Sequence, residues 1–405
     1  MRSALTLAFG AVLVSSCAAP QGGVSPAGAG APLVVENSRC AGAGIAVDTS
    51  FDAGALDSCK VSDDGRLAVF IAPEDEPPIN CSPWYAFRLH TSAPRMVDVS
   101  LRYTACGHRY RPKVSTDGVT WTYVDPGSVE VTEFAGSAMA RFPVETDGRP
   151  LFVSAQEIIV PATYDAWLDG IEGRDLVSRF ELGRSAEGRP IEAIEIGSPG
   201  AREQIVLVGR QHPPEVTGAL AMLPFMEELM ADTKLAIRFR DRFLVTAVPM
   251  LNPDGVVHGY WRHNTGGVDL NRDWGPFSQP ETRLMGTLLK DMADDPARDL
   301  RLLLDFHSTG RDIFYTIPDE LPTDPALFTA KWLERYQARM EDYEVTRDAR
   351  HEVGRPISKA HAFDTYGVPA VTFELGDETD RKLIRKIGRE AAIALMEELL
   401  ETPRP

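Results

Sequence analysis

The chain has 405 residues, of which 43% are hydrophobic and 25% charged, and this composition is ordinary for a globular protein. It excludes a disordered, collagen-like or fibrous character for most of the chain, and the length predicts two or three domains with sizeable cores. The 42 Lys and Arg against 59 Asp and Glu give a net charge of −17, so we expect no nucleic-acid partner, because phosphate binding needs a positive field.

Residues 1–17 are typical of an export signal. Arg2 precedes an apolar run from Ala4 to Val14, which is too short to span ~30 Å of hydrocarbon. The end of this segment, Val14-Ser15-Ser16-Cys17, resembles a bacterial lipobox, so we expect Cys17 to be lipidated and to become the mature N-terminus. A plain signal peptide cleaved nearby is the alternative. We therefore expect an exported protein in the periplasm or cell envelope, held at a membrane only by its lipid.

Two segments with different composition follow this signal. Residues 18–34 are mostly Ala, Gly, Pro and Ser and indicate a flexible tether. Residues 35–155 contain short apolar runs separated by turn residues, and this spacing predicts a small all-β sandwich domain. The predicted strands are Leu67–Ile71, Trp84–Leu89, Met96–Tyr103, Thr120–Tyr123 and Phe152–Val153. Sequence does not decide whether this domain binds a partner or carbohydrate, or braces its neighbour.

The cysteines other than Cys17 all lie in the predicted sandwich, at Cys40, Cys59, Cys81 and Cys106. An even number in an exported region predicts two disulfides, and three connectivities are open. A zinc site made of all four is the alternative. The spacings contain no C-x-x-C pair, which disfavours such a site.

Residues 156–405 alternate strand-like and helix-like patterns. This alternation predicts an α/β domain with a mixed, mostly parallel sheet and helices on both faces. The predicted strands are Ile191–Ile196, Gln204–Gly209, Phe243–Val248, Leu302–Phe306 and Pro369–Phe373, and the predicted helices are 215–231, 278–294, 324–342 and 381–401.

Polar side chains that suit metal chemistry follow several of these strands. His212 and Glu215 come after one strand, His307 follows another, and Glu374 lies within a third. Because sites in open α/β sheets gather beyond the carboxyl ends of the strands, we expect these side chains to meet. Two His and one Glu are a normal catalytic zinc set, and a further carboxylate is needed to accept a proton. Each motif alone is weak, since H-x-x-E is common by chance.

The combination of motifs is more specific than its parts. In chain order the sequence carries HPPE, NPDG, WRHN, GVDLNRDW, DFHS and TFELG. This series resembles the zinc carboxypeptidase family of metallopeptidases over about residues 159–400. The HPPE motif is closest to the HPGE form of the cytosolic-carboxypeptidase-like branch, in which a β-sandwich precedes the catalytic domain. The segment Pro83-Trp84-Tyr85-Ala86-Phe87 is similar to the strand that marks that sandwich.

The resemblance implies a role for individual residues. It implies one Zn²⁺ per chain on His212, Glu215 and His307, a general base at Glu374, oxyanion stabilisation by Arg262, and a grip on the substrate's terminal carboxylate by Asn271 and Arg272. Elementary chemistry agrees with these roles. A fixed cation lowers the energy of a tetrahedral oxyanion, and a guanidinium binds a carboxylate in fork geometry.

The sequence departs from the family pattern in two places, and one specificity residue is open. Pro214 stands where some members carry an arginine, and the segment Glu344–Ile357, where the family's substrate-capping tyrosine is expected, contains no tyrosine. Tyr343 and Tyr366 flank this segment, and neither fits that role well. Counting about fifteen residues back from Glu374 predicts that Lys359 faces the released side chain, which favours acidic residues. A one-residue shift would place Ala360 there instead, and a surface lysine is the third alternative.

The sequence therefore predicts a zinc-dependent metallocarboxypeptidase that acts on peptides with a free C-terminal carboxylate. Its substrates would be protein C-termini or peptidoglycan stem peptides. One alternative is a zinc amidase or deacylase built on the same core. The other is a catalytically silent surface-binding lipoprotein. This alternative is disfavoured because a suitable residue stands at every predicted metal-ligand position.

Overall fold

The computed structural model describes residues 33–134 and 137–404, and Leu33–Pro405 form one compact unit. The predicted signal, Cys17 and nearly all of the predicted tether lie outside the described residues. Among the helices of the described part, none is long and apolar enough to cross a membrane.

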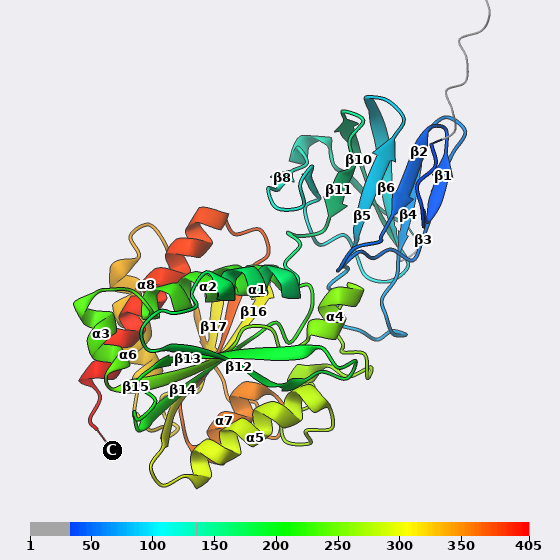
Figure 1. The fold of residues 1–405 in the computed structure, drawn as a ribbon. Coiled ribbons are helices and arrows are strands. Elements are labelled where there is room, and N and C mark those ends of the chain that lie inside the picture. Colours follow the sequence, from blue (N-terminus) through cyan, green and yellow to red (C-terminus); the bar gives the residue numbers. More distant parts are fainter. Residues whose placement is uncertain (1–32, 135–136, 405) are drawn as a thin grey trace, which may run out of the picture. The chain divides into compact units, whose positions relative to one another are not determined.

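The N-terminal region folds as a sandwich of two sheets around a shared apolar core (Figure 1). The six-stranded sheet has the order β1 (Cys40–Gly42), β2 (Ile45–Asp48), β5 (Ala86–Thr91), β11 (Leu151–Ser154), β7 (Lys113–Ser115) and β8 (Thr122–Tyr123). The five-stranded sheet has the order β3 (Ser58–Val61), β4 (Leu67–Ile71), β6 (Arg95–Tyr103), β10 (Ser137–Thr146) and β9 (Glu130–Phe134). Strand β6 alternates inward apolar and outward polar residues, as a half-buried strand should.

Both predicted disulfides form in this sandwich. Cys40 pairs with Cys59 and thereby links β1 to β3, which belong to different sheets. Cys81 pairs with Cys106 and joins two loops. The structure thus selects one of the three open connectivities and uses all four cysteines, so none is left for a zinc site.

The C-terminal region is built on one mixed sheet of eight strands. Its order is β12 (Val177–Arg184), β13 (Pro190–Gly197), β15 (Phe243–Val248), β14 (Glu203–Gly209), β16 (Asp299–Thr309), β19 (Ala370–Gly376), β17 (Ile313–Thr316) and β18 (Arg347–Ala349). The central strands β15, β14, β16 and β19 are parallel, while β13 and β17 join them antiparallel on either side. This arrangement confirms the predicted mixed α/β fold.

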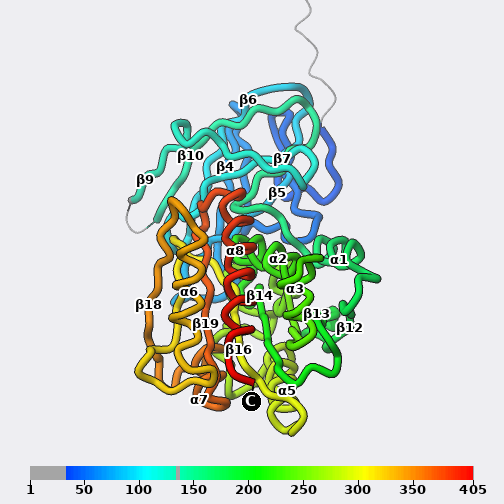
Figure 2. Tube along the Cα trace, turned by 90° about the vertical axis from the view of Figure 1, so that its left-hand side faces the viewer, coloured from blue at the N-terminus to red at the C-terminus, as the bar shows by residue number. Residues whose placement is uncertain are grey.

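Helices cover both faces of this sheet (Figure 1). One face carries α1 (Pro161–Asp169), α2 (Val216–Leu229), α3 (Lys234–Arg240), α6 (Phe328–Arg339) and α8 (Arg381–Glu401), and the other α5 (Pro280–Asp294) and α7 (Ser358–Tyr366). Figure 2 shows α8 lying along the sheet between α6 and α2, both of which it contacts. The short helix α4 (Pro253–His258) follows β15.

Strand β14 is apolar from Ile205 to Val208, and the packing on its two faces explains this run. Ile205 and Leu207 point into the core under α2 and α8, whereas Val206 and Val208 point into the core under α5. Because both faces are covered, every residue of this strand is buried. The carboxyl ends of β14 and its parallel neighbour β16 therefore meet at one edge, where the polar residues begin.

Candidate active site and metal centre

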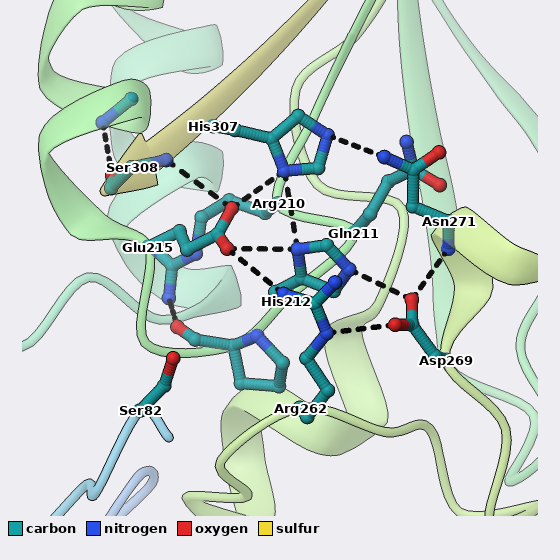
Figure 3. A network of polar contacts seen from close by, with 12 residues as sticks. Ser82, Arg210, Gln211, His212, Glu215, Arg262, Asp269, Asn271, His307 and Ser308 are labelled. Carbon is teal, nitrogen blue, oxygen red and sulfur yellow. Dashed lines mark hydrogen bonds and ion pairs between the residues drawn. The ribbon is translucent and has the colours of Figure 1, made fainter. Parts of the chain in front are cut away.

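The three residues predicted as metal ligands converge at this edge (Figure 3). His212 and Glu215 lie on the turn between β14 and α2, and His307 lies in β16. Nδ1 of His212 is 2.8 Å from Oε1 of Glu215, and Nδ1 of His307 is 2.6 Å from Oε2. The two Nδ1 atoms are 3.1 Å apart, and all three side chains are buried.

Each imidazole is held from behind by a second carboxylate. Nε2 of His212 is 2.9 Å from Oδ1 of Asp269, and Nε2 of His307 is 2.8 Å from Oδ2 of Asp305. Such partners bind the Nε2 proton and leave the Nδ1 lone pair for a metal. Two lone pairs that face one carboxylate at these distances fit a shared divalent cation, and this nitrogen and oxygen donor set suits zinc.

The charges around the three predicted ligands, which we call the triad, favour a bound cation. Burial opposes ionisation of Glu215, but the imidazoles of His212 and His307 outweigh it and hold the pKa of that carboxyl well below its usual range. Burial likewise opposes protonation of His307, yet the carboxylates of Asp305 and Glu215 hold its pKa well above the usual value. The site therefore attracts positive charge, for which a metal ion competes with a proton.

Close packing of α2 on β16 positions Glu215. A Cβ on Gly218 would lie 2.6 Å from the carbonyl oxygen of His307, so only glycine permits this approach. Oγ of Ser308 accepts a hydrogen bond from the amide of Gly218 at 2.8 Å. On the preceding turn, Nη2 of Arg210 donates to the carbonyl of Pro213 at 2.8 Å. Local sequence thus fixes the turn that carries two ligands.

Glu374 lies beside the triad on β19, directly opposite His307 in the strand pairing. Burial raises the pKa of its carboxyl to about 8. Its Oε2 makes no hydrogen bond to any residue that the structure describes. A buried carboxyl that titrates near neutrality suits a group that takes up and returns a proton.

Arg262 is held beside the triad by side-chain and backbone contacts. Its Nε donates to Oδ2 of Asp269 at 2.8 Å, and its Nη1 is 3.5 Å from Oε1 of Glu215. The backbone amides of residues 261, 262 and 263 all donate to the carboxylate of Glu74, at 2.7, 2.8 and 2.8 Å. Glu74 follows β4 of the sandwich, so the N-terminal region fixes the backbone of Arg262. Sequence reasoning missed this contact.

Asn271 and Arg272 reach the same cavity but differ in freedom. The side-chain oxygen of Asn271 accepts a hydrogen bond from the amide of Ser358 at 2.9 Å, and its nitrogen lies 3.2 Å from Nε2 of His307. Asn271 is thus tied into the framework. Arg272 donates to the carbonyl of Asn271 at 2.7 Å and is exposed, so its guanidinium remains accessible.

A cavity of about 260 Å³ unites these groups and is lined mainly by polar atoms. Its arginines are Arg109, Arg262, Arg272, Arg350 and Arg355. This concentration contrasts with the chain's net charge of −17 and indicates an anionic ligand. Arg109 and Asn80 belong to the sandwich, and sequence reasoning singled out neither of them, nor Arg350 or Arg355.

A family model described as zinc carboxypeptidase matches residues 164–394, which is more than half of the chain. The chain belongs to the zinc carboxypeptidase family. The predicted family and hydrolase class are therefore confirmed, and the family is zinc-dependent.

Curated members of the zinc carboxypeptidase family share part of this sequence. The chain is 32% identical over 162 residues to cytosolic carboxypeptidase 6 of Homo sapiens, covering 36% of this chain and 32% of that protein. It is 25% identical over 296 residues to cytosolic carboxypeptidase 6 of Mus musculus, covering 65% and 53%. The matched part thus spans between about a third and a half of these relatives.

Solved structures of bacterial metallo-carboxypeptidases share the fold. A metallo-carboxypeptidase from Burkholderia cenocepacia superposes with a TM-score of 0.74 at 19% identity, over 88% of this chain and 99% of that one. One from Pseudomonas aeruginosa, in complex with (2-guanidinoethylmercapto)succinic acid, gives 0.68 at 18% identity, with the same coverage.

Lys359, the predicted specificity residue of this member of the zinc carboxypeptidase family, lies behind the cavity wall. It is buried in α7 and donates from Nζ to the carbonyl of Arg350 at 2.6 Å. Burial lowers the pKa of its amine to about 8. The residues that line the cavity include Arg350, Thr372 and Tyr315 but not Lys359. Tyr315, on β17, is the tyrosine that reaches the cavity, and it lies outside the segment in which the family's capping tyrosine was sought.

Proposed function

We propose that this zinc carboxypeptidase-family chain hydrolyses the C-terminal peptide bond of peptides, with one zinc ion per chain on His212, Glu215 and His307. One observation carries the proposal. A single cavity gathers a buried metal-donor set, the carboxyl of Glu374, whose Oε2 has no hydrogen-bond partner among the described residues, and an exposed guanidinium at Arg272. Zinc, when bound there, would polarise the scissile carbonyl and acidify a water molecule.

The protein's own side chains divide the remaining work. Glu374 takes the proton from the attacking water and returns it to the leaving amine. Arg262 donates hydrogen bonds to the developing oxyanion. The hydrogen bond from Arg262 to Asp269 holds the guanidinium in place for this role. Arg272 binds the terminal carboxylate in fork geometry, and Asn271 orders the surrounding loop.

We also propose that the released residue is acidic. Arg350 and Arg355 line the cavity and would pair with a Glu, Asp or diaminopimelate carboxylate. Lys359 supports this arrangement by holding the backbone of Arg350, and its own amine remains a second candidate for the contact. Protein C-termini and peptidoglycan stem peptides both offer such ends.

The proposed setting is the bacterial periplasm or cell envelope, with a lipid anchor at Cys17. The two disulfides of the sandwich support export, because disulfides persist in oxidising compartments. The Cys17→Ser variant should leave the membrane fraction and appear soluble. A mature N-terminus other than a lipidated Cys17, found by mass spectrometry, would refute the anchor.

Paired peptides test the activity. The purified protein should release Glu from a peptide with a free C-terminal carboxylate and should cleave the C-terminally amidated form at least about tenfold more slowly, because Arg272 loses its charged partner. Equal cleavage of both forms would favour the amidase or deacylase. Zinc binding without hydrolysis of either form would favour a binding protein.

A further inference from the structure

The sandwich supplies part of the cavity wall. Asn80 and Arg109 line the cavity together with the metal-donor residues and Glu374, although they precede them by more than one hundred residues. The sandwich core also continues into the C-terminal region, where it includes Val216 of α2 and Trp261. These shared contacts hold the wall against the catalytic centre.

Arg109 is anchored along one edge and accessible along the other. Its Nε donates to Oδ2 of Asp377 at 2.8 Å. Its Nη1 donates to the carbonyl of Cys81 and to Oγ of Ser82, both at 2.8 Å. Nη2 makes no hydrogen bond within the described part of the chain, and the side chain is 23% exposed. A fixed guanidinium with one free edge is a built donor site for oxygen acceptors.

The disulfide Cys81–Cys106 preorganises this wall. Asn80 directly precedes Cys81, and Arg109 follows Cys106 by three residues. The bond therefore joins the two loops that carry the two side chains. Because the loops are tied before any ligand arrives, binding does not have to order them.

Arg109 and Arg272 line the same cavity but come from different regions of the chain. Arg109 lies in a loop of the sandwich, and Arg272 lies in the C-terminal region, next to Asn271. The two guanidiniums are also held by different partners, Arg109 by Asp377 and Arg272 by the carbonyl of Asn271. A peptide whose carboxylate sits on Arg272 would share this cavity with Arg109.

We propose that Asn80 and Arg109 form a subsite for the retained part of the peptide, upstream of the bond that is cut. The free edge of Arg109 donates hydrogen bonds to acceptor oxygens of the retained peptide. The side-chain amide of Asn80 forms a second hydrogen bond with the same part of the peptide. In this proposal the ligand is a peptide of at least three residues, so that its retained part reaches Asn80 and Arg109. This inference rests on the proposed function and adds a substrate-length requirement that the sandwich imposes.

Two substrates that share their last two residues test the subsite. One is an N-acylated dipeptide and the other a pentapeptide, and kcat/KM is measured for both with wild type, Arg109→Ala and Asn80→Ala. We expect Arg109→Ala to lose at least tenfold on the pentapeptide, mainly through KM, and less than twofold on the dipeptide. Equal losses on both substrates, or no loss on either, would overturn the proposal.

A matched control separates binding from docking of the sandwich. Glu378 accepts a hydrogen bond from the backbone amide of Arg111 at 3.1 Å, next to the Arg109–Asp377 pair. Glu378→Gln should preserve the ratio of the two kcat/KM values. If Arg109→Ala fails to fold, Asn80→Ala alone decides, and it should lower kcat/KM for the pentapeptide selectively.

Further arms identify the acceptor and separate this proposal from the proposed function. Pentapeptides with Ala or Glu at the upstream positions distinguish main-chain carbonyls from side-chain carboxylates as the acceptors. Binding of a fluorescent pentapeptide is also measured in Glu374→Gln with and without Arg109→Ala. If wild type hydrolyses nothing, the proposed function fails, while weaker binding in the double variant still supports the subsite and equal binding overturns it.

Discussion

The carboxylate of Glu74 accepts a hydrogen bond from the backbone amide of Arg262 at 2.8 Å, and it also accepts hydrogen bonds from the amides of the two neighbouring residues. Glu74 is thus a positioning residue that acts from the sandwich through the backbone of Arg262. In the proposed mechanism Arg262 stabilises charge in the transition state, so a small displacement should affect kcat more than KM.

Glu74→Gln should lower kcat about tenfold, leave KM within about twofold and keep the zinc content, because one amide oxygen cannot replace both carboxylate oxygens. Steady-state kinetics with metal analysis measures this split. Asp75→Asn is the matched control, since Asp75 contacts the side chain of His263 and not these amides. A proportional rise of KM with unchanged kcat would contradict the positioning role.

Removing a proposed ligand should remove the metal. His307→Ala loses Nδ1 from the donor set, so we expect zinc content to collapse and the zinc-dependent rise in melting temperature to vanish. His258→Ala is a suitable control, because His258 is partly exposed and pairs with Glu187 instead. Stoichiometric, tightly bound zinc in His307→Ala would refute the ligand assignment.

The role of Glu374 is tested by an isosteric change. Glu374→Gln keeps the shape of the side chain but cannot accept a proton, so turnover should fall by about 10² to 10⁴-fold while zinc remains bound. Activity and zinc content are measured on the same preparation. Near-normal turnover would remove Glu374 from the chemistry.

The preference for the C-terminal residue of the substrate tests whether Arg350 or Lys359 determines specificity. We expect Arg350→Ala to lose on the order of 1 kcal/mol of preference for Glu over Phe at the C-terminus, because a partly exposed charged partner is removed. Lys359→Ala should change the preference less, since its amine holds a backbone carbonyl. The measurement is kcat/KM for peptides ending in Glu, Lys and Phe. The reverse order of the two variants would restore Lys359 as the specificity residue.

Sequence predicted best the parts of the fold whose pattern is local. Strand β14 carries an apolar run from Ile205 to Val208 because both of its faces are covered, and the prediction missed only its first residue, Glu203. Strand β10 is not among the predicted strands. Pro143 interrupts its alternating pattern, and a proline within a run weakens the strand signal. In the structure Pro143 lies beyond the end of the β9 pairing and faces only β6, where a missing amide is tolerated.

The same distinction holds for the site. The metal-donor residues and Glu374 were predicted because each lies at or near the end of a recognisable strand. Asp305 stands two residues before His307 in the same strand, and this short spacing could have indicated it. Glu74, Asn80 and Arg109 lie in loops of the sandwich, and only tertiary folding brings them to the cavity, so no spacing in the sequence announces them.

The packing of α8 on α2 has a consequence for how the protein is made. A Cβ on Gly388 of α8 would lie 2.3 Å from the carbonyl of Ala221, so the two helices are in direct backbone contact. Helix α2 begins right after Glu215, and β19 with Glu374 also comes late in the chain. We therefore expect a nascent polypeptide to remain inactive until α8 has been synthesised and has docked on α2.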